Sequence, residues 1–119
     1  MTDDSSVRST PSSNLSRAYE GTFVPLGKPV IAGPLTVVPL EIVEDSRCPV
    51  DTQCIWAGRV IVRSEIIAPD GTSNRDLTLG EETRVNGYGH RVTLTDMRPD
   101  RREAAPIEPG DYRFRFTGR

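Results

Sequence analysis

The sequence is poor in cysteine and aromatic residues, and it contains no long apolar run. Two cysteines and one histidine among 119 residues cannot supply the four ligands of a structural zinc site. No stretch approaches the ~18 apolar residues that a membrane-spanning helix requires, so we expect no transmembrane segment. The net charge is −2 with both signs interspersed, whereas nucleic-acid binding needs a clustered basic face. We therefore expect no nucleic-acid partner.

The first eighteen residues also lack the features of a signal peptide and of a folded segment. They contain neither the basic segment nor the apolar segment of a signal peptide, and Ser and Thr are frequent among them. Such a segment has too few large apolar side chains to offset the entropy lost on ordering. We predict a flexible leader over residues 1–18 and one domain over residues 19–119. Two origins fit this leader: a cytosolic start, or a mature secreted chain in which Met1 replaces a removed signal.

From residue 19 onward, no stretch of ten residues has the apolar spacing of an amphipathic helix. Short alternating runs are separated by Gly, Pro and Asp, which indicates strands and turns. The clearest strand is expected over residues 54–67, with Trp56 facing inward together with Val60, Val62 and Ile66. A turn at residues 69–71 then predicts a hairpin with the next run, in which Leu77 and Leu79 are in step.

Three further runs alternate in the same way. Residues 35–43 place Val38, Leu40 and Ile42 in step, and Pro39 predicts an edge position or a bulge there. Residues 90–97 and 111–119 alternate apolar and charged side chains, and residues 96–111 read as a surface loop. The fold class predicted is all-β, an antiparallel β-sandwich of immunoglobulin-like size with six to eight strands. A small β-barrel is the alternative.

Cys48 and Cys54 enclose a five-residue segment that begins with Pro49 and contains Asp51, two residues that favour turns. A turn could bring the two Cα atoms within disulfide distance, and the bridge would restrain the unfolded chain by roughly 2–2.5 kcal/mol. We therefore expect a structural disulfide, which implies an oxidising compartment, the periplasm or the cell exterior. A cytoplasmic location stays open.

Other chemistries of this segment are less favoured. A redox dithiol favours two intervening residues at a helix N-terminus, whereas five residues separate these cysteines and no helix is expected. Calcium requires six or more oxygens, and the acidic residues near Cys48 lack the spacing of a calcium loop. Arg47 could neutralise those acids instead. Trp56 is expected in the core beside the bridge, and Gly58 indicates a bulge or a close contact.

No catalytic motif is present, and His90 reads as a surface residue at a strand end. The alternating Arg59, Arg63, Arg113 and Arg115 indicate a solvated sheet face that could also bind an acidic surface. We expect a non-enzymatic protein without a cofactor or metal.

Residues 45–49 read DSRCP and residues 54–58 read CIWAG. This pattern resembles the DSRCP…C-x-W-x-G signature of small uncharacterised bacterial proteins that are mostly secreted or lipid-anchored. The resemblance covers residues 23–116 and leaves the leader unmatched. It implies a β fold outside the cytoplasm, and it assigns no catalytic residue.

Together these features predict an extracytoplasmic binding or structural domain that presents a disulfide-stapled loop to another protein or an envelope component. The residues predicted to contact the partner are Asp45, Arg47, Asp51 and Gln53. Two alternatives remain: a small hydrolase or thiol-redox enzyme around His90 and the cysteines, and a calcium-dependent ligand-binding module.

Overall fold

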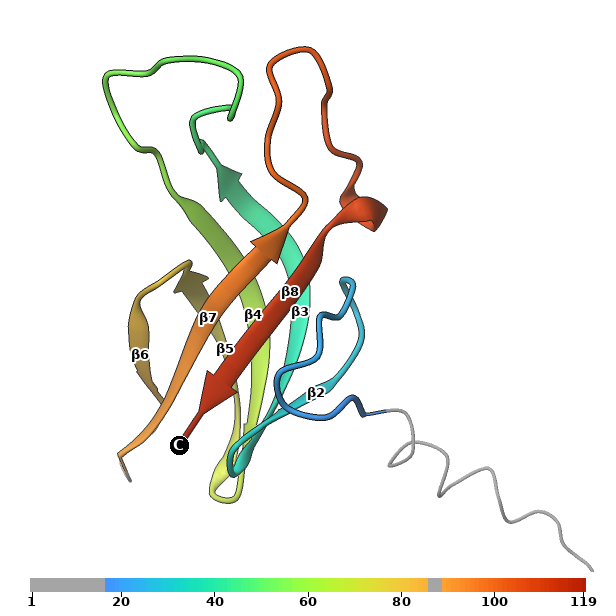
Figure 1. Ribbon diagram of the computed structural model, residues 1–119. Helices are drawn as coiled ribbons and strands as arrows, with labels where there is room; N and C mark the ends of the chain where they lie inside the picture. The colour runs from blue at the N-terminus through green and yellow to red at the C-terminus, as the bar shows by residue number, and fades with distance from the viewer. Residues whose placement is uncertain (1–16, 86–88) are drawn as a thin grey trace, which may run out of the picture.

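The computed structural model describes residues 17–85 and 89–119 (Figure 1). Within these ranges, seven strands form two antiparallel sheets, which confirms the all-β prediction and its sandwich form. The larger sheet has the order β2-β3-β4-β5, formed by Val30–Ala32, Leu35–Asp45, Val60–Ala68 and Gly71–Thr78. The smaller sheet has the order β6-β7-β8, formed by Glu82–Val85, His90–Arg98 and Arg113–Gly118.

Strand β4 is the regular centre of the larger sheet. Its side chains alternate between buried and more exposed positions, because successive residues of a strand point to opposite faces. It pairs with β5 in a tight hairpin, in which Ala68 is opposite Gly71. The predicted turn at residues 69–71 and the hairpin after it are confirmed.

Strand β3 contains the irregularity that Pro39 predicted. Its register with β4 shifts between Pro39 and Glu41 and again between Ile42 and Glu44. A proline has no N–H to give to the ladder, so a bulge accommodates it. The strand lies between β2 and β4 rather than at an edge. The prediction that Val38, Leu40 and Ile42 share one inward face was wrong. Val37 is buried, whereas the Leu40 side chain is 42% exposed.

The smaller sheet follows its sequence pattern closely. Val92 and Leu94 of β7 and Phe114 and Phe116 of β8 are buried, while the residues between them point outward. Tyr112, just before β8, stacks near Phe114 with ring centroids 6.0 Å apart. These side chains pack against the buried face of the larger sheet, and together they form one core.

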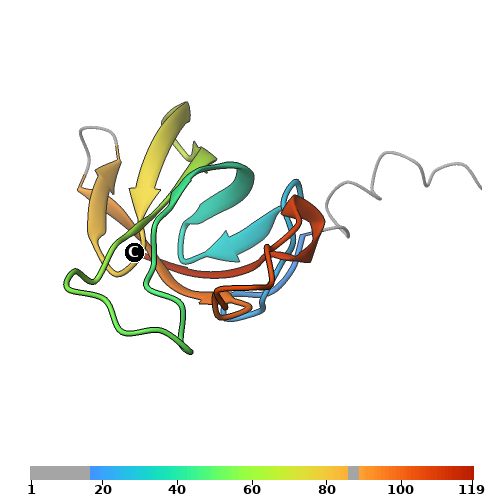
Figure 2. The ribbon, with the colours of Figure 1, turned by 90° about the horizontal axis from the view of Figure 1, so that it is seen from above.

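The two sheets face each other across that core, as the view from above shows (Figure 2). At one margin the chain passes between them: the Leu79 N–H donates to Val60 of β4, and the Gly80 N–H donates to Leu94 of β7. At the other margin, Ala18 pairs with Val30 of β2. Farther along the same segment, Val24 pairs with Phe114 of β8. The predicted leader falls outside the described residues except for positions 17 and 18.

Long loops leave the same end of the two sheets. Residues 46–59 connect β3 to β4, and residues 99–112 connect β7 to β8 and include a short 3-10 turn at Pro109–Asp111. Figure 1 shows both loops at the top, side by side. The described residues include no helix long and apolar enough to cross a membrane.

Candidate functional site on the disulfide loop

The loop of residues 46–59, here called the disulfide loop, is closed by a bond between Cys48 and Cys54. Their Cα atoms are 5.9 Å apart, which lies within the range that disulfides adopt. No free thiol is present in residues 17–85 and 89–119. The predicted structural bridge is confirmed, and both sulfurs are occupied by it.

The two ends of the disulfide loop are joined at a narrow neck. The Ser46 N–H donates to the Arg59 carbonyl at 2.8 Å, and the Arg59 N–H donates to Ser46 Oγ at 3.0 Å. Gly58 has a φ of +73°, and a Cβ atom there would lie 1.8 Å from the Ser46 carbonyl oxygen. Only glycine fits this position, because both its left-handed backbone and its contact exclude a side chain. The close contact predicted at Gly58 is confirmed, although the residue lies in the loop and not in a strand.

An ion pair anchors the base of the loop. Arg47 donates from Nε and Nη2 to the two carboxylate oxygens of Asp45 at 2.8 and 2.9 Å, and Tyr112 donates its hydroxyl to the same carboxylate at 2.8 Å. The Arg47 and Asp45 side chains are only 17% and 7% exposed. Bidentate pairing of this kind is strong as well as geometrically specific. Asp45 and Arg47 therefore hold the loop in place.

The titration of these groups reflects their contacts. Burial raises the pKa of Asp45, but the hydrogen bonds from Arg47 and Tyr112 outweigh it and leave that pKa below its ordinary value. Burial and the hydrogen bond to Asp45 raise the pKa of Tyr112 to about 12. The site is thus an ionised carboxylate with a neutral phenol over the whole neutral range.

The loop of residues 99–112 supports the disulfide loop along its length. The Val50 N–H donates to the Arg101 carbonyl at 2.8 Å, and Thr52 Oγ1 donates to the Glu103 carboxylate at 2.9 Å. The Glu103 N–H donates to the Asp51 carboxylate at 3.0 Å. Arg47 also donates to the Pro99 carbonyl at 3.1 Å. Two loops that are distant in sequence therefore form one hydrogen-bonded unit.

Three large apolar side chains are exposed on this unit, and all come from the disulfide loop. Ile55 is 96% exposed, Trp56 is 61% exposed and Val50 is 56% exposed. The expectation that Trp56 packs in the core was wrong. Strand β4 begins only at Val60: residues 54–59 form no strand, and Gly58 has a left-handed backbone where it closely approaches Ser46. Residues 54–59 consequently leave the sheet and carry Trp56 beyond the reach of the core.

The four residues predicted to contact a partner divide into two pairs. Asp45 and Arg47 are mostly buried in their own ion pair, whereas Asp51 and Gln53 are exposed near the apolar tip. Sequence reasoning missed the roles of Val50, Ile55 and Trp56 at the surface and of Tyr112 beneath the loop. The glycine at 58 was the available signal, since a glycine can end a strand as well as interrupt it.

Few side chains suited to the alternative metal or catalytic functions come together among the described residues. In residues 17–85 and 89–119, no three His, Cys, Asp or Glu side chains come together as a metal site would require. Glu44 accepts hydrogen bonds from Ser46 and Arg59, which hold its pKa below the ordinary value. His90 opens strand β7, half-buried, and Tyr88 lies outside the described residues.

No protein-family model, curated protein or solved structure matches this chain. The resemblance to the DSRCP…C-x-W-x-G proteins therefore stays a prediction.

Proposed function

We propose that this chain is a non-enzymatic binding domain outside the cytoplasm, which holds another protein or an envelope component at the tip of its disulfide loop. The observation that carries this proposal is the exposure of Val50, Ile55 and Trp56 on the disulfide loop, Val50 within the bridged ring and the other two directly after Cys54. Large apolar side chains that gather at an exposed site, with polar residues beside them, are typical of interaction surfaces.

The energetics of such a surface are favourable. Burying an exposed aromatic and its aliphatic neighbours yields roughly 25 cal/mol per Å² of apolar area removed from water. Tryptophan is frequent among the few residues that dominate binding energy. The bridge, the neck and the ion pair have already ordered the loop, so less conformational entropy is lost when a partner binds.

Polar residues beside the tip provide for specificity. Asp51 and Gln53 are exposed on the ring closed by the bridge, and the Asp51 carboxylate accepts one backbone hydrogen bond from the supporting loop. A carboxylate has further acceptor sites beyond that one. We infer that Asp51 and Gln53 form the polar rim around Ile55 and Trp56, while Asp45 and Arg47 position the loop.

The bridge supports the proposed compartment. Disulfides persist in oxidising surroundings and are rare in the cytosol, where reductants keep thiols free. The Cys48–Cys54 bond therefore supports a periplasmic or extracellular location for this domain. The predicted resemblance to the DSRCP…C-x-W-x-G proteins favours the same compartment.

The test is affinity capture from the envelope fraction of the native cells with the oxidised protein as bait. The loop variant is Ile55→Ser/Trp56→Ser, and the matched control is Val43→Ser/Ile67→Ser, which removes two exposed apolar side chains from the larger sheet. We expect one specific component to be retained by the wild type and the control and lost with the loop variant. Equal retention by all three would contradict the proposal.

A further inference from the structure

A second surface, unrelated to the disulfide loop, lies on the outer face of the smaller sheet. Side chains that alternate with the buried residues of β6, β7 and β8 point outward there. Six of them are arginines and two are carboxylates, which gives this face a formal charge of +4 on a chain whose net charge is −2. We call it the arginine face, and its arginines are Arg84, Arg91, Arg98, Arg113, Arg115 and Arg119.

The register of the paired strands places arginines directly opposite each other. Arg84 lies opposite Arg91, and Arg98 lies opposite Arg113. Like charges directly opposite each other destabilise a sheet, so fold stability alone does not account for this arrangement. A partner of opposite charge would relieve the repulsion.

Half of these arginines form no salt bridge with a carboxylate among the described residues, although Arg98 interacts electrostatically with Asp96. Arg98 lies over the ring of Phe23 at 4.2 Å, Arg113 donates to two backbone carbonyls at 2.8 Å, and Arg84 makes no ion pair within the described ranges. The other three arginines are paired, Arg115 with Asp96 and both Arg91 and Arg119 with Glu82. The face therefore carries uncompensated positive charge along its length.

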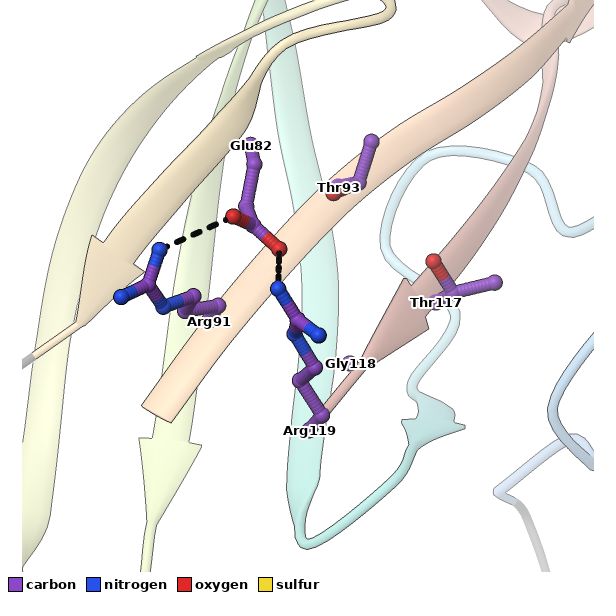
Figure 3. Close-up of a pocket in the computed structure, with 6 residues that line it drawn as sticks. All are labelled: Glu82, Arg91, Thr93, Thr117, Gly118 and Arg119. Atoms are coloured by element: carbon purple, nitrogen blue, oxygen red, sulfur yellow. Dashed lines mark hydrogen bonds and ion pairs between the residues drawn. The ribbon is translucent and has the colours of Figure 1, made fainter. Parts of the chain in front are cut away.

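A pocket of about 310 Å³ opens at one end of this face (Figure 3). Glu82 accepts one hydrogen bond from Arg91 at 3.0 Å and one from Arg119 at 2.8 Å, and it lies between the two guanidinium groups. Thr93 and Thr117 line the pocket beside them. Each guanidinium has five N–H donors, so both keep donors for a ligand. A volume of this order suits one sugar unit at the low end of ligand pockets.

The described residues of the arginine face include no exposed large apolar side chain, which restricts the kind of partner that this face can bind. The exposed large apolar side chains of the described residues all lie on other elements, whereas protein interfaces bury an apolar centre. Single-stranded nucleic acids require aromatic rings for stacking, and the ring of Phe23 is already covered by Arg98 and Arg115 at 4.2 and 4.7 Å. Among the described residues, a cationic surface with hydroxyl groups, whose one aromatic ring is covered by arginines, fits an anionic carbohydrate.

We propose that the arginine face binds an anionic polysaccharide, with one sugar unit in the pocket beside Thr93 and Thr117 and its carboxylate or sulfate group directed to the guanidinium donors that Glu82 leaves free. The remaining anionic groups of the polymer follow the row of arginines toward Arg98 and Arg113. The planar fork of arginine matches carboxylate and sulfate oxygens in a bidentate manner. This site is independent of the disulfide loop, and either can operate without the other.

Affinity electrophoresis tests the proposal with polygalacturonate as the carboxylated probe and dextran sulfate as the sulfated one. Uncharged dextran, polyglutamate and a single-stranded oligonucleotide are the comparison polymers. The variant is Arg84→Glu/Arg113→Glu, because neither residue has a carboxylate partner in the described structure. Its matched control, Arg75→Glu/Arg102→Glu, makes the same change in net charge at two exposed residues elsewhere.

We expect one or both charged polysaccharides to retard the wild type, with an affinity that falls as salt rises. The variant should lose at least about tenfold in affinity and the control should change little. Retardation by neither polysaccharide at low ionic strength would overturn the proposal. Equal loss in the control, or tighter binding of polyglutamate or the oligonucleotide, would overturn it as well.

Discussion

At the scale of single residues, Asp45 is central to the disulfide loop although it was expected at its surface. Its carboxylate, at the end of β3, accepts hydrogen bonds from Arg47 in the disulfide loop and from Tyr112 just before β8. One buried carboxylate thus joins the loop to the sandwich. Its removal would leave Arg47 without its partner in a mostly buried position, which is costly.

Replacing this carboxylate should change how stability depends on pH. The folded pKa of Asp45 is lowered, so its stabilisation is fully present above its unfolded pKa of about 3.9 and is lost as pH falls through the folded value. We expect Asp45→Asn to lose about 1–3 kcal/mol in unfolding free energy at pH 7. The difference in unfolding free energy between Asp45→Asn and the wild type should narrow below about pH 4.

Urea unfolding followed by circular dichroism between neutral and strongly acidic pH measures this gap. Asp76→Asn is the matched control, because Asp76 pairs with Arg63 at 3.0 Å on an exposed part of the larger sheet. Exposed pairs contribute little, so the control should stay near the wild type throughout. A gap for Asp45→Asn that is the same at every pH would contradict the assigned role of the carboxylate.

The residues that could be predicted from sequence are those governed by alternation alone. Phe114 and Phe116 face the core because their neighbours are charged and the strand is regular. Leu40 was misplaced because two register shifts in β3 break the alternation, and a sequence does not show where a bulge begins. Trp56 was misplaced because its apolar character favoured the core, whereas residues 54–59 form no strand and β4 starts only at Val60, after the left-handed backbone of Gly58.

At the scale of elements, the disulfide loop and the loop of residues 99–112 depend on each other. Their hydrogen bonds join residues about fifty positions apart, such as Thr52 with Glu103. No local pattern indicates a contact of this kind. By contrast, the disulfide within the loop follows from spacing and turn residues alone, and it was predicted.

Removing the disulfide measures its contribution to the free energy of unfolding separately from that of the hydrogen bonds between the two loops. We expect Cys48→Ser/Cys54→Ser to lose about 2 kcal/mol in unfolding free energy, since the unfolded chain is no longer restrained. The β-sandwich should persist, because the core residues lie outside the loop. Urea unfolding gives the free energy, and circular dichroism reports the retained fold.

Thiol labelling provides the control for this experiment. The protein purified without reductant should take up no label at Cys48 or Cys54 until it is reduced. Labelling of both residues in the native protein would contradict the bridge and, with it, the assignment to an oxidising compartment.

Strand β6 is an element that could not be predicted from the sequence. Its sequence, ETRV, has one strongly apolar residue and no clear alternation, so it was not expected as a strand. It forms because Glu82–Val85 pair in regular register with the first residues of β7. Pairing with a neighbour, rather than its own propensity, determines such a short strand.

At the scale of the whole molecule, folding sorts charges that the sequence intersperses. The smaller sheet gathers its arginines on one outer face, whereas the larger sheet neutralises Arg63 with Glu41 and Asp76. Alternation within one strand indicates that Arg113 and Arg115 face outward, but it does not show which charges of other strands lie beside them, because cross-strand register decides that. The sandwich therefore has two outer faces of different electrostatic character and an apolar loop tip at one end.

Trp56 reports directly on the exposure of the apolar tip, because it is the single tryptophan of the chain. Collisional quenching of its fluorescence by acrylamide measures its exposure in the oxidised, native protein. We predict quenching nearly as strong as in the urea-unfolded chain, since the side chain is 61% exposed. A native Trp56 that is shielded from acrylamide and becomes quenchable only on unfolding would contradict the account.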